Sequence, residues 1–228
     1  ALLMEMGTGK SKVAIDTMAA LYEAGKVKAA LIIAPKGVYD NWVKGEVPIH
    51  LPKRIPRDIM RWIPAKTKRF EIDLKDFIVN RDPILKVFVV NIEAFSSTRG
   101  TEAALAFLYQ NPDNIVIVDE STTIKNRKAA RTKNILALQK WAKYRRILTG
   151  SPITKSPMDL FSQCNFLAEK ALGFNSYFAF QARYANVQKR TMGHRSFQQI
   201  VGYRRLDELS EKLNKFSSRV LKVDCLDL

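Results

Sequence analysis

The chain carries Met6-Gly7-Thr8-Gly9-Lys10-Ser11 close to its beginning, and this stretch decides the predicted fold. Its two glycines allow a tight backbone loop whose N–H groups point inward. Lys10 supplies a positive charge for the β- and γ-phosphates of a nucleotide, and Ser11 can ligate Mg²⁺. A helix-forming run from Lys12 to Tyr22 follows, so its positive N-terminal end would face the same phosphates. The stretch therefore predicts a P-loop, with Gly7 to Ser11 as the nucleotide-binding residues.

One position departs from the full P-loop pattern, because Met4 stands where another glycine is expected. A Gly-x-Gly-Lys-Ser sequence also occurs in ordinary turns before helices. The phosphate-binding interpretation therefore depends on what the rest of the chain supplies.

Composition indicates a globular protein of 228 residues with 46% hydrophobic residues, enough for one large domain or one domain with a small appendage. No apolar stretch approaches the roughly 20 residues that span a bilayer, so we expect a soluble, intracellular protein, cytoplasmic if bacterial or phage-encoded and nuclear if eukaryotic. Two cysteines and two histidines, widely spaced, offer no metal-binding cluster.

The charge balance is strongly basic, with 38 Lys and Arg residues against 22 Asp and Glu residues, a formal net charge of +16. Such an excess favours a polyanionic partner. A solvated basic face that serves solubility is the alternative. An anionic membrane surface is less favoured, because no basic amphipathic helix with a clean apolar face stands out.

Apolar runs at 29–34, 86–91, 115–118 and 144–148 alternate with helical patterns, as in a doubly wound, mostly parallel α/β sheet. A short helix is expected after Pro35 and should break at Pro48. After residue 171 the strand signals fade, aromatic residues accumulate with spacing typical of packing, and 188–199 is a polar, basic stretch. We therefore predict an ATPase domain over 1–170 and a mainly helical appendage over 171–228.

Asp119 and Glu120 end the apolar run at 115–118. In open α/β sheets the ligand lies beyond the carboxyl ends of the strands, so this pair can face the P-loop. Asp119 can then hold the Mg²⁺ water shell, while Glu120 orients or deprotonates an attacking water. For an isolated pair, a helix N-cap with a first-turn charge would be the simpler interpretation.

Five segments, in this order, resemble motifs I, Ia, Ib, II and III of superfamily-two helicases: Met4 to Ser11, Ile33 to Lys36 with Asn41-Trp42, Val90 to Glu93, Val118 to Asn126, and Ile147 to Ile153. Ile124-Lys125-Asn126, and Asp159 to Phe161 with Asn165 to Leu167, narrow the resemblance to the Swi/Snf-type DNA translocases. The tail from Leu206 to Asp224 is similar to the segment that leads from the first ATPase lobe to the second.

The resemblance implies the first, N-terminal RecA-like lobe of an ATP-hydrolysing motor on double-stranded DNA. It implies that Lys10 and Ser11 bind the phosphates of ATP and Mg²⁺, that Asp119 acts through the metal, and that Glu120 activates the attacking water. Thr149 and Ser151 would couple the nucleotide state to the DNA, while Pro35, Lys36 and Asn91 would lie along the DNA and contact its backbone without reading its sequence.

The sequence also departs from the family. Thr122 stands where relatives usually have a histidine, so coupling could differ. We expect the strand that feeds the P-loop to be missing, together with motifs IV, V and VI of a second lobe. Because arginine fingers belong to motif VI and accelerate such reactions by roughly 10³–10⁵, the chain alone should be nearly inactive.

Two other functions stay open from the sequence. The chain could be the motor of a restriction or phage DNA-processing enzyme. It could also be a non-hydrolysing nucleic-acid-binding scaffold with a relic P-loop, although Lys10, Ser11, Asp119 and Glu120 are all intact.

Overall fold

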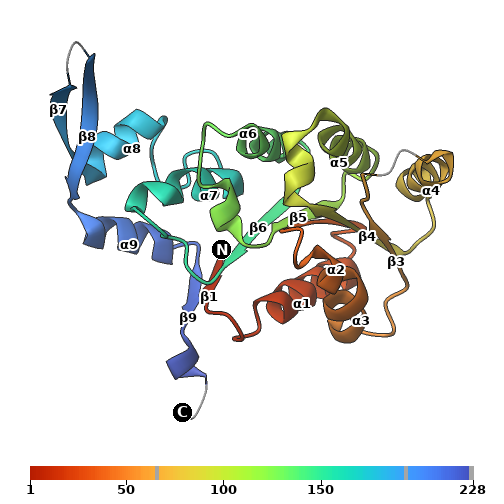
Figure 1. Cartoon of the computed structure of the whole chain (residues 1–228). Helices are drawn as coiled ribbons and strands as arrows, with labels where there is room; N and C mark the ends of the chain where they lie inside the picture. Colours follow the sequence, from red (N-terminus) through yellow and green to blue (C-terminus); the bar gives the residue numbers. More distant parts are fainter. Residues whose placement is uncertain (65–66, 193–194, 226–228) are drawn as a thin grey trace.

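The computed structural model describes residues 1–64, 67–192 and 195–225 and contains a central seven-stranded sheet (Figure 1). All of its neighbouring strands run parallel. The strand order is β3 (Arg57–Arg61), β4 (Leu85–Asn91), β2 (Ala29–Ala34), β5 (Asn114–Val118), β6 (Tyr144–Thr149), β1 (Leu2–Met4) and β9 (Ser218–Val220). The predicted doubly wound α/β architecture is confirmed.

The central strands are buried on both faces, which explains their unbroken apolar sequences. Side chains along β2 alternate between two cores, because successive residues of a strand point to opposite faces. Leu31 and Ile33 belong to one core, and Ala30 and Ile32 belong to the other.

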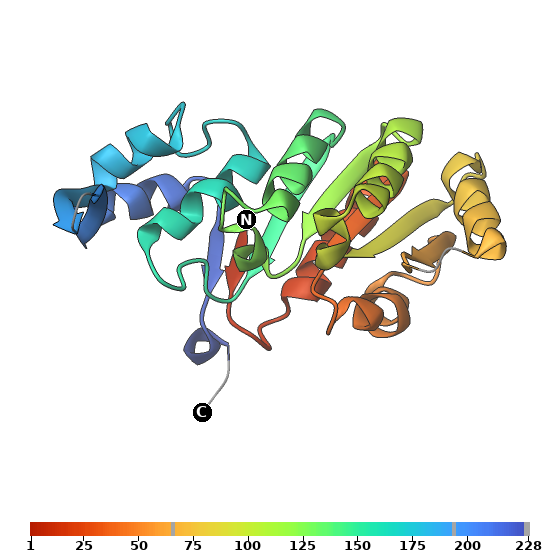
Figure 2. The ribbon, with the colours of Figure 1, turned by 45° about the horizontal axis from the view of Figure 1, so that its top comes forward.

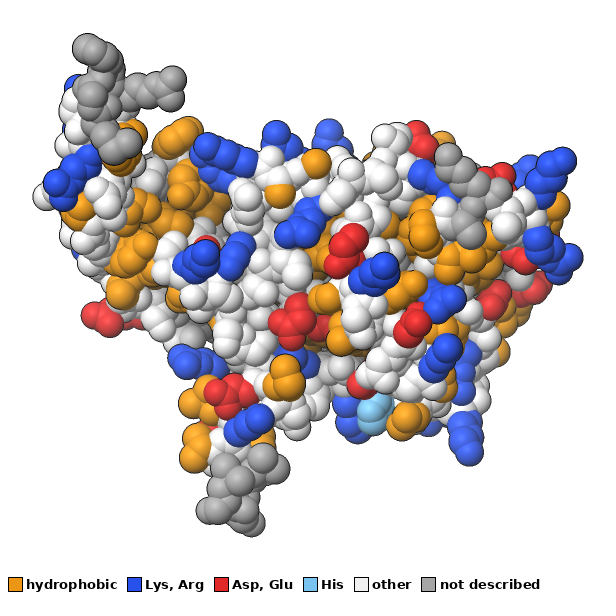
Figure 3. All heavy atoms as spheres, viewed as in Figure 1, with side chains coloured by type: hydrophobic (Ala, Val, Ile, Leu, Met, Phe, Trp, Pro, Cys, Tyr) orange, Lys and Arg blue, Asp and Glu red, His pale blue; other side chains and the backbone are white. Residues whose placement is uncertain are grey.

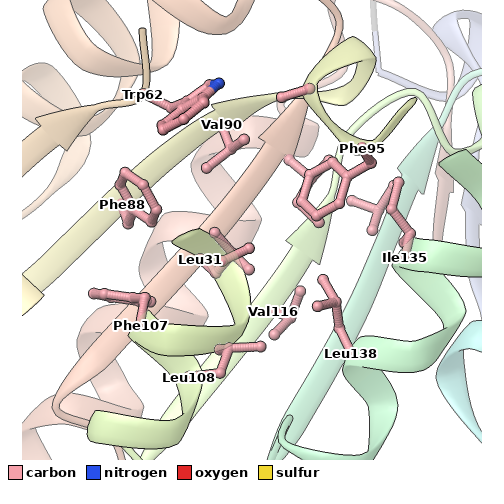
Figure 4. Packing of buried hydrophobic residues seen from close by; sticks show 14 of the residues in the cluster. Leu31, Trp62, Phe88, Val90, Phe95, Phe107, Leu108, Val116, Ile135 and Leu138 are labelled. Carbon is pink, nitrogen blue, oxygen red and sulfur yellow. The ribbon is translucent and has the colours of Figure 1, made fainter. Parts of the chain in front are cut away.

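Helices cover both faces of the sheet. The core that contains Leu31 is closed by α4 (Lys68–Val79), α5 (Thr98–Gln110) and α6 (Ala130–Ala137), with the 3-10 turns Ile92–Ser96 and Leu138–Lys140. Figure 4 shows Leu108 of α5 and Leu138 near Val116 of the sheet, Phe107 of α5 below Phe88 of β4, and Ile135 of α6 beside Phe95. The opposite core is closed by α1 (Lys10–Glu23) and by the helical segment that follows β2. Within the described ranges, no helix is long and apolar enough to cross a membrane.

The helical segment after Pro35 does not break at Pro48, contrary to the prediction. Instead α2 (Tyr39–Asn41), a π-helical turn over Trp42–Glu46, and α3 (Val47–His50) follow one another, with Pro48 in the first turn of α3. The Val47 N–H donates to the carbonyl of Trp42, five residues earlier. Because proline lacks an N–H and its ring crowds the carbonyl four residues before it, the wider π-turn accommodates Pro48 inside the segment.

The strand that feeds the P-loop is present, which corrects the expectation that it was missing. β1 lies between β6 and β9, with Leu3 opposite Thr149 on one side and Arg219 on the other. Its three residues are too few to show a period in the sequence, so only pairing in the sheet defines it as a strand.

The C-terminal region combines helices with an antiparallel hairpin, which the prediction of a mainly helical appendage did not include. After the 3-10 turn Pro157–Asp159 and α7 (Leu160–Leu167) come α8 (Tyr177–Tyr184), the antiparallel hairpin of β7 (Ala185–Met192) and β8 (Arg195–Tyr203), and α9 (Leu206–Asn214). The hairpin lies at the end of the molecule away from β3 and α4, and it contains residues of the polar, basic stretch at 188–199 (Figure 2). The mixed polar sequence of β7 and β8 does not predict strands, because these two strands are paired by backbone hydrogen bonds more than by an apolar face.

A third core joins this region to α7. Leu160 and Cys164 of α7 pack with Phe180 and Tyr184 of α8 and with Leu209 of α9. The predicted packing role of the aromatic residues holds for these two rings, whereas Phe178 is 67% exposed. The division of the chain at residue 170 stays a prediction, and β9 belongs to the main sheet.

Candidate nucleotide-binding site

The predicted P-loop connects β1 to α1 at the carboxyl edge of the sheet. Gly7 and Gly9 adopt left-handed conformations, with φ of 86° and 87°, which glycine reaches without steric cost. Gly9 is the N-cap of α1, and no side chain caps the helix there. Because Lys10 and Ser11 open this 14-residue helix, uncapped N–H groups at its positive end are available to phosphate oxygens. The loop therefore fits a nucleotide.

Inside the loop, two side chains donate to one carbonyl oxygen. The Lys10 ammonium donates to the oxygen of Glu5 at 3.1 Å, and the Thr8 hydroxyl donates to the same oxygen at 2.7 Å. The backbone N–H of Thr8 adds a third bond at 3.3 Å. Lys10 is thus held within the loop itself, by a bond that a phosphate oxygen can replace.

Asp119 follows β5 and is almost completely buried, with 8% of its surface exposed. Its carboxylate accepts one hydrogen bond from the indole Nε1 of Trp42 at 2.9 Å and another from the backbone N–H of Glu120 at 2.9 Å. Its own N–H donates to the carbonyl of Ile33 at the end of β2. Burial raises the pKa of Asp119, while the bond from Trp42, the bond from Glu120 and the charge of Lys10 oppose that rise. The carboxylate is therefore fixed before any ligand binds.

Glu120 stands next to it in a left-handed backbone conformation, with φ of 46° and ψ of 60°. This conformation is strained for a residue with a side chain, and such strain concentrates at functional sites. The Glu120 carboxylate accepts a hydrogen bond from the Thr149 hydroxyl at 3.3 Å. Burial and the neighbouring charge of Asp119 raise the pKa of Glu120, and Lys10 and the Thr149 bond lower it. A carboxylate with a raised pKa suits proton transfer near neutral pH.

A pocket of about 420 Å³ opens beside Glu120. The structure brings together here three residues predicted from the sequence, since Thr149 and Ser151 line the pocket with Glu120, and the Ser151 N–H donates to the Thr149 hydroxyl at 3.3 Å. Thr122, the residue in the usual histidine position, also lines it. The remaining lining residues are Glu5, Met6, Gly150, Thr154 and Lys222.

Two of the three residues predicted to lie along DNA meet at a second pocket, of about 560 Å³. Lys36 after β2 and Asn91 at the end of β4 both line it, together with Tyr39 and Arg99. Pro35 does not line this pocket. Its carbonyl oxygen accepts hydrogen bonds from the N–H groups of Val38 and Tyr39, and these bonds begin the turn into α2. On the face drawn in Figure 3, Lys and Arg side chains are spread over the whole surface instead of forming one patch.

Sequence reasoning missed the roles of two residues. Trp42, which the sequence analysis named only as part of the segment that resembles motif Ia, is 1% exposed, and its indole N–H donates to Asp119. A buried tryptophan usually needs a partner for that N–H, so its burial was the available signal. Arg127 stacks on Tyr177, with its guanidinium carbon 4.2 Å from the ring centre. Nothing in the local sequence indicated that contact.

Known proteins are similar to this chain in sequence and in fold. The profile of the SNF2-related domain matches residues 2–224. The chain is 28% identical over 223 residues to the DNA annealing helicase and endonuclease ZRANB3 of Mus musculus, a match that covers 97% of this chain and 19% of the relative. It is 29% identical over 189 residues to the SWI/SNF-related matrix-associated actin-dependent regulator of chromatin subfamily A-like protein 1 of Bos taurus, covering 83% of this chain and 17% of that protein.

A solved structure, the Sulfolobus solfataricus SWI2/SNF2 ATPase core in complex with dsDNA, superimposes with a TM-score of 0.65 at 20% identity. The superposition covers 98% of this chain and 40% of the other, and it shows a common fold. The chain spans about a fifth of the length of the curated relatives it matches.

Proposed function

Because the chain belongs to the SNF2-related domain family, we propose that it is the first, N-terminal RecA-like lobe of an ATP-hydrolysing translocase that moves along double-stranded DNA. A second RecA-like lobe of the same parent protein would complete its active site. The compartment would be the one that holds the DNA, the cytoplasm of a bacterium or the nucleus of a eukaryote.

One observation carries the proposal. Helix α1 begins at Lys10 with no side-chain cap, so its first N–H groups are available to phosphate oxygens, and Glu5 and Met6 of the loop before it line the same pocket as Glu120 and Thr149. A triphosphate with Mg²⁺ has the charges that suit a positive helix end and a lysine on one side and carboxylates on the other.

Each residue of the site has a chemical task in this proposal. Lys10 and the uncapped N–H groups of α1 would bind the β- and γ-phosphates. Ser11 and Asp119 would hold Mg²⁺, which when bound neutralises charge on the phosphate oxygens. Glu120 would orient the attacking water and accept its proton, and Thr149 keeps that carboxylate in place.

The coupling residues would connect this chemistry to DNA. Thr149 touches both Glu120 and the backbone of Ser151, so a change at the phosphate can move the loop after β6. Lys36 and Asn91, and the backbone turn at Pro35, would follow the phosphate backbone of DNA by contacts that ignore sequence.

Phosphate release measured with and without duplex DNA tests the proposal. We expect the two-lobed parent protein to show DNA-stimulated hydrolysis that Lys10→Ala and Glu120→Gln abolish, and the isolated chain to be slower by roughly 10³–10⁵. Unchanged DNA-stimulated hydrolysis in both variants would leave a nucleic-acid-binding scaffold as the better description. Full turnover by the isolated chain would show that the second lobe is not needed.

A further inference from the structure

A lysine near the other end of the sequence lies over the P-loop. Strands β1 and β9 are parallel neighbours, so the residues that follow them emerge at the same edge of the sheet. The Glu5 N–H donates to the carbonyl of Val220 at 3.0 Å, and the backbone N–H of Lys222 donates to the Glu5 carboxylate at 2.7 Å. The segment after β9 is thereby fastened to the residue that begins the P-loop.

The Lys222 side chain extends from this point along the loop. Its Cε lies 3.9 Å from the position that a Cβ on Gly7 would occupy, and the residue lines the same pocket as Glu120 and Thr149. In the described part of the chain, the Lys222 ammonium has no hydrogen bond or ion pair, although Glu5 and Glu120 line the pocket with it. Lys10, by contrast, donates to a loop carbonyl. Lys222 thus presents an unpartnered cation to the pocket.

We propose that Lys222 is a second phosphate-binding lysine, supplied by the same chain, which contacts the terminal phosphate of a bound nucleoside triphosphate. The proposal rests on the function proposed above, because it uses the same site. Lys222 lines the same pocket as Glu120, the residue proposed to orient the attacking water. Because water attacks the terminal phosphate, the Lys222 ammonium would face that phosphate. A flexible ammonium can reach an oxygen there as a point charge.

This assignment gives the site a way to distinguish triphosphate from diphosphate. A diphosphate leaves Lys222 without its partner, whereas Lys10 keeps the β-phosphate. Because Lys222 lies two residues after the end of β9, and β9 follows α9, a contact between Lys222 and the terminal phosphate would also affect the C-terminal segment. A purely structural role, fastening the segment to Glu5, needs only the backbone N–H and would ignore the nucleotide.

Binding of Mg-ATPγS and of Mg-ADP to the chain, measured by isothermal titration calorimetry, separates these roles. We expect Lys222→Ala to weaken Mg-ATPγS binding roughly 10-fold, the size of one charge-assisted contact, and Mg-ADP binding less than about 2-fold. Lys222→Arg should restore most of the affinity for Mg-ATPγS. Lys215→Ala, which removes another exposed lysine at the end of α9, is the matched control and should bind both nucleotides like the wild type.

Equal effects on the two nucleotides, or no effect on either, would overturn the assignment of Lys222. Failure of the wild-type chain to bind any nucleotide would instead overturn the function proposed for the site. Loss of binding by Lys10→Ala with normal binding by Lys222→Ala would keep the proposed function and exclude Lys222 from it.

Discussion

The two halves of the candidate site are built differently. The P-loop half is exposed at Gly7 and Gly9, bonds to its own carbonyl at Glu5, and needs little from the rest of the chain. The carboxylate half is buried, and Asp119 and Glu120 are held by Trp42 and Thr149, which come from distant segments. The half proposed to bind phosphate can therefore rearrange around a ligand, while the fold fixes the two carboxylates in advance.

The difference has an energetic basis. Ionised carboxylates lose hydration when they are buried, which raises the pKa of both Asp119 and Glu120. Hydrogen bonds from Trp42 and Thr149 offset part of that cost and restrict where each carboxylate lies. The loop carries no such cost, since its lysine stays partly exposed. Four changes test this contrast, from the largest expected effect to the smallest.

Lys10→Ala should weaken nucleotide binding by the P-loop half of the site without lowering the stability of the fold. The ammonium makes only a local bond to Glu5, so thermal stability should stay close to that of the wild type, whereas nucleotide affinity should fall roughly 100-fold with the loss of a charge-assisted contact of about 3 kcal/mol. Calorimetric titration and thermal unfolding measure the two quantities. A large loss of stability would show that the loop is not self-contained.

Trp42→Phe should disturb the carboxylate half and the fold together. It keeps a buried ring but removes the N–H that donates to Asp119, which costs about 1–3 kcal/mol of unfolding free energy. Urea unfolding measures this cost. Trp141→Phe, at a tryptophan that is 44% exposed, is the control and should have little effect.

The cost of Trp42→Phe should also depend on pH. The bond from Trp42 lowers the pKa of Asp119, so its removal raises further a pKa that burial already raises. A carboxyl whose folded pKa exceeds its unfolded value loses stability as the pH rises through that folded pKa. The gap between variant and wild type should therefore shrink when urea unfolding is repeated at lower pH. A gap that is constant with pH would mean that the bond does not act on the charged form.

Thr149→Val should have a smaller effect, of about 1 kcal/mol on stability. It preserves shape at a fully buried position but removes the donor to Glu120 and the acceptor for the Ser151 N–H. In the two-lobed parent, turnover should fall more than nucleotide affinity, because Thr149 positions Glu120 without contacting the P-loop. Thr149→Ser keeps the hydroxyl and should retain turnover, and equal damage by both substitutions would point to packing instead.

Thr8→Val is the matched change in the loop and should have the smallest effect. Its hydroxyl bonds only to the Glu5 carbonyl, which also receives bonds from Lys10 and from the Thr8 backbone. We expect a stability change within about 0.5 kcal/mol in thermal or urea unfolding. A cost equal to that of Thr149→Val would remove the proposed difference between the two halves.

Short local patterns in the sequence predicted a large part of this structure. The glycines and lysine of the P-loop, the carboxylates after an apolar strand, and the unbroken apolar runs of β2, β4 and β5 each depend on neighbours in sequence. The helix-forming run from Lys12 to Tyr22 likewise predicted α1 within a few residues of its ends. Because ligands of open α/β sheets lie beyond the carboxyl ends of the strands, it could also be expected that Asp119 and Glu120 face the P-loop.

The sequence by itself therefore determined the fold class, and it also predicted most of the residues that are proposed to bind a nucleotide. The tertiary structure alone decided that Leu2 to Met4 form a strand, that Trp42 reaches Asp119 across 77 positions, and that Lys222 lies over the P-loop 217 positions from Glu5. The physical reason is that the period of apolar residues indicates which face of an element is buried, but it does not indicate which distant residue packs against that face. Those partners are set by the order in which the parallel strands lie side by side in the sheet.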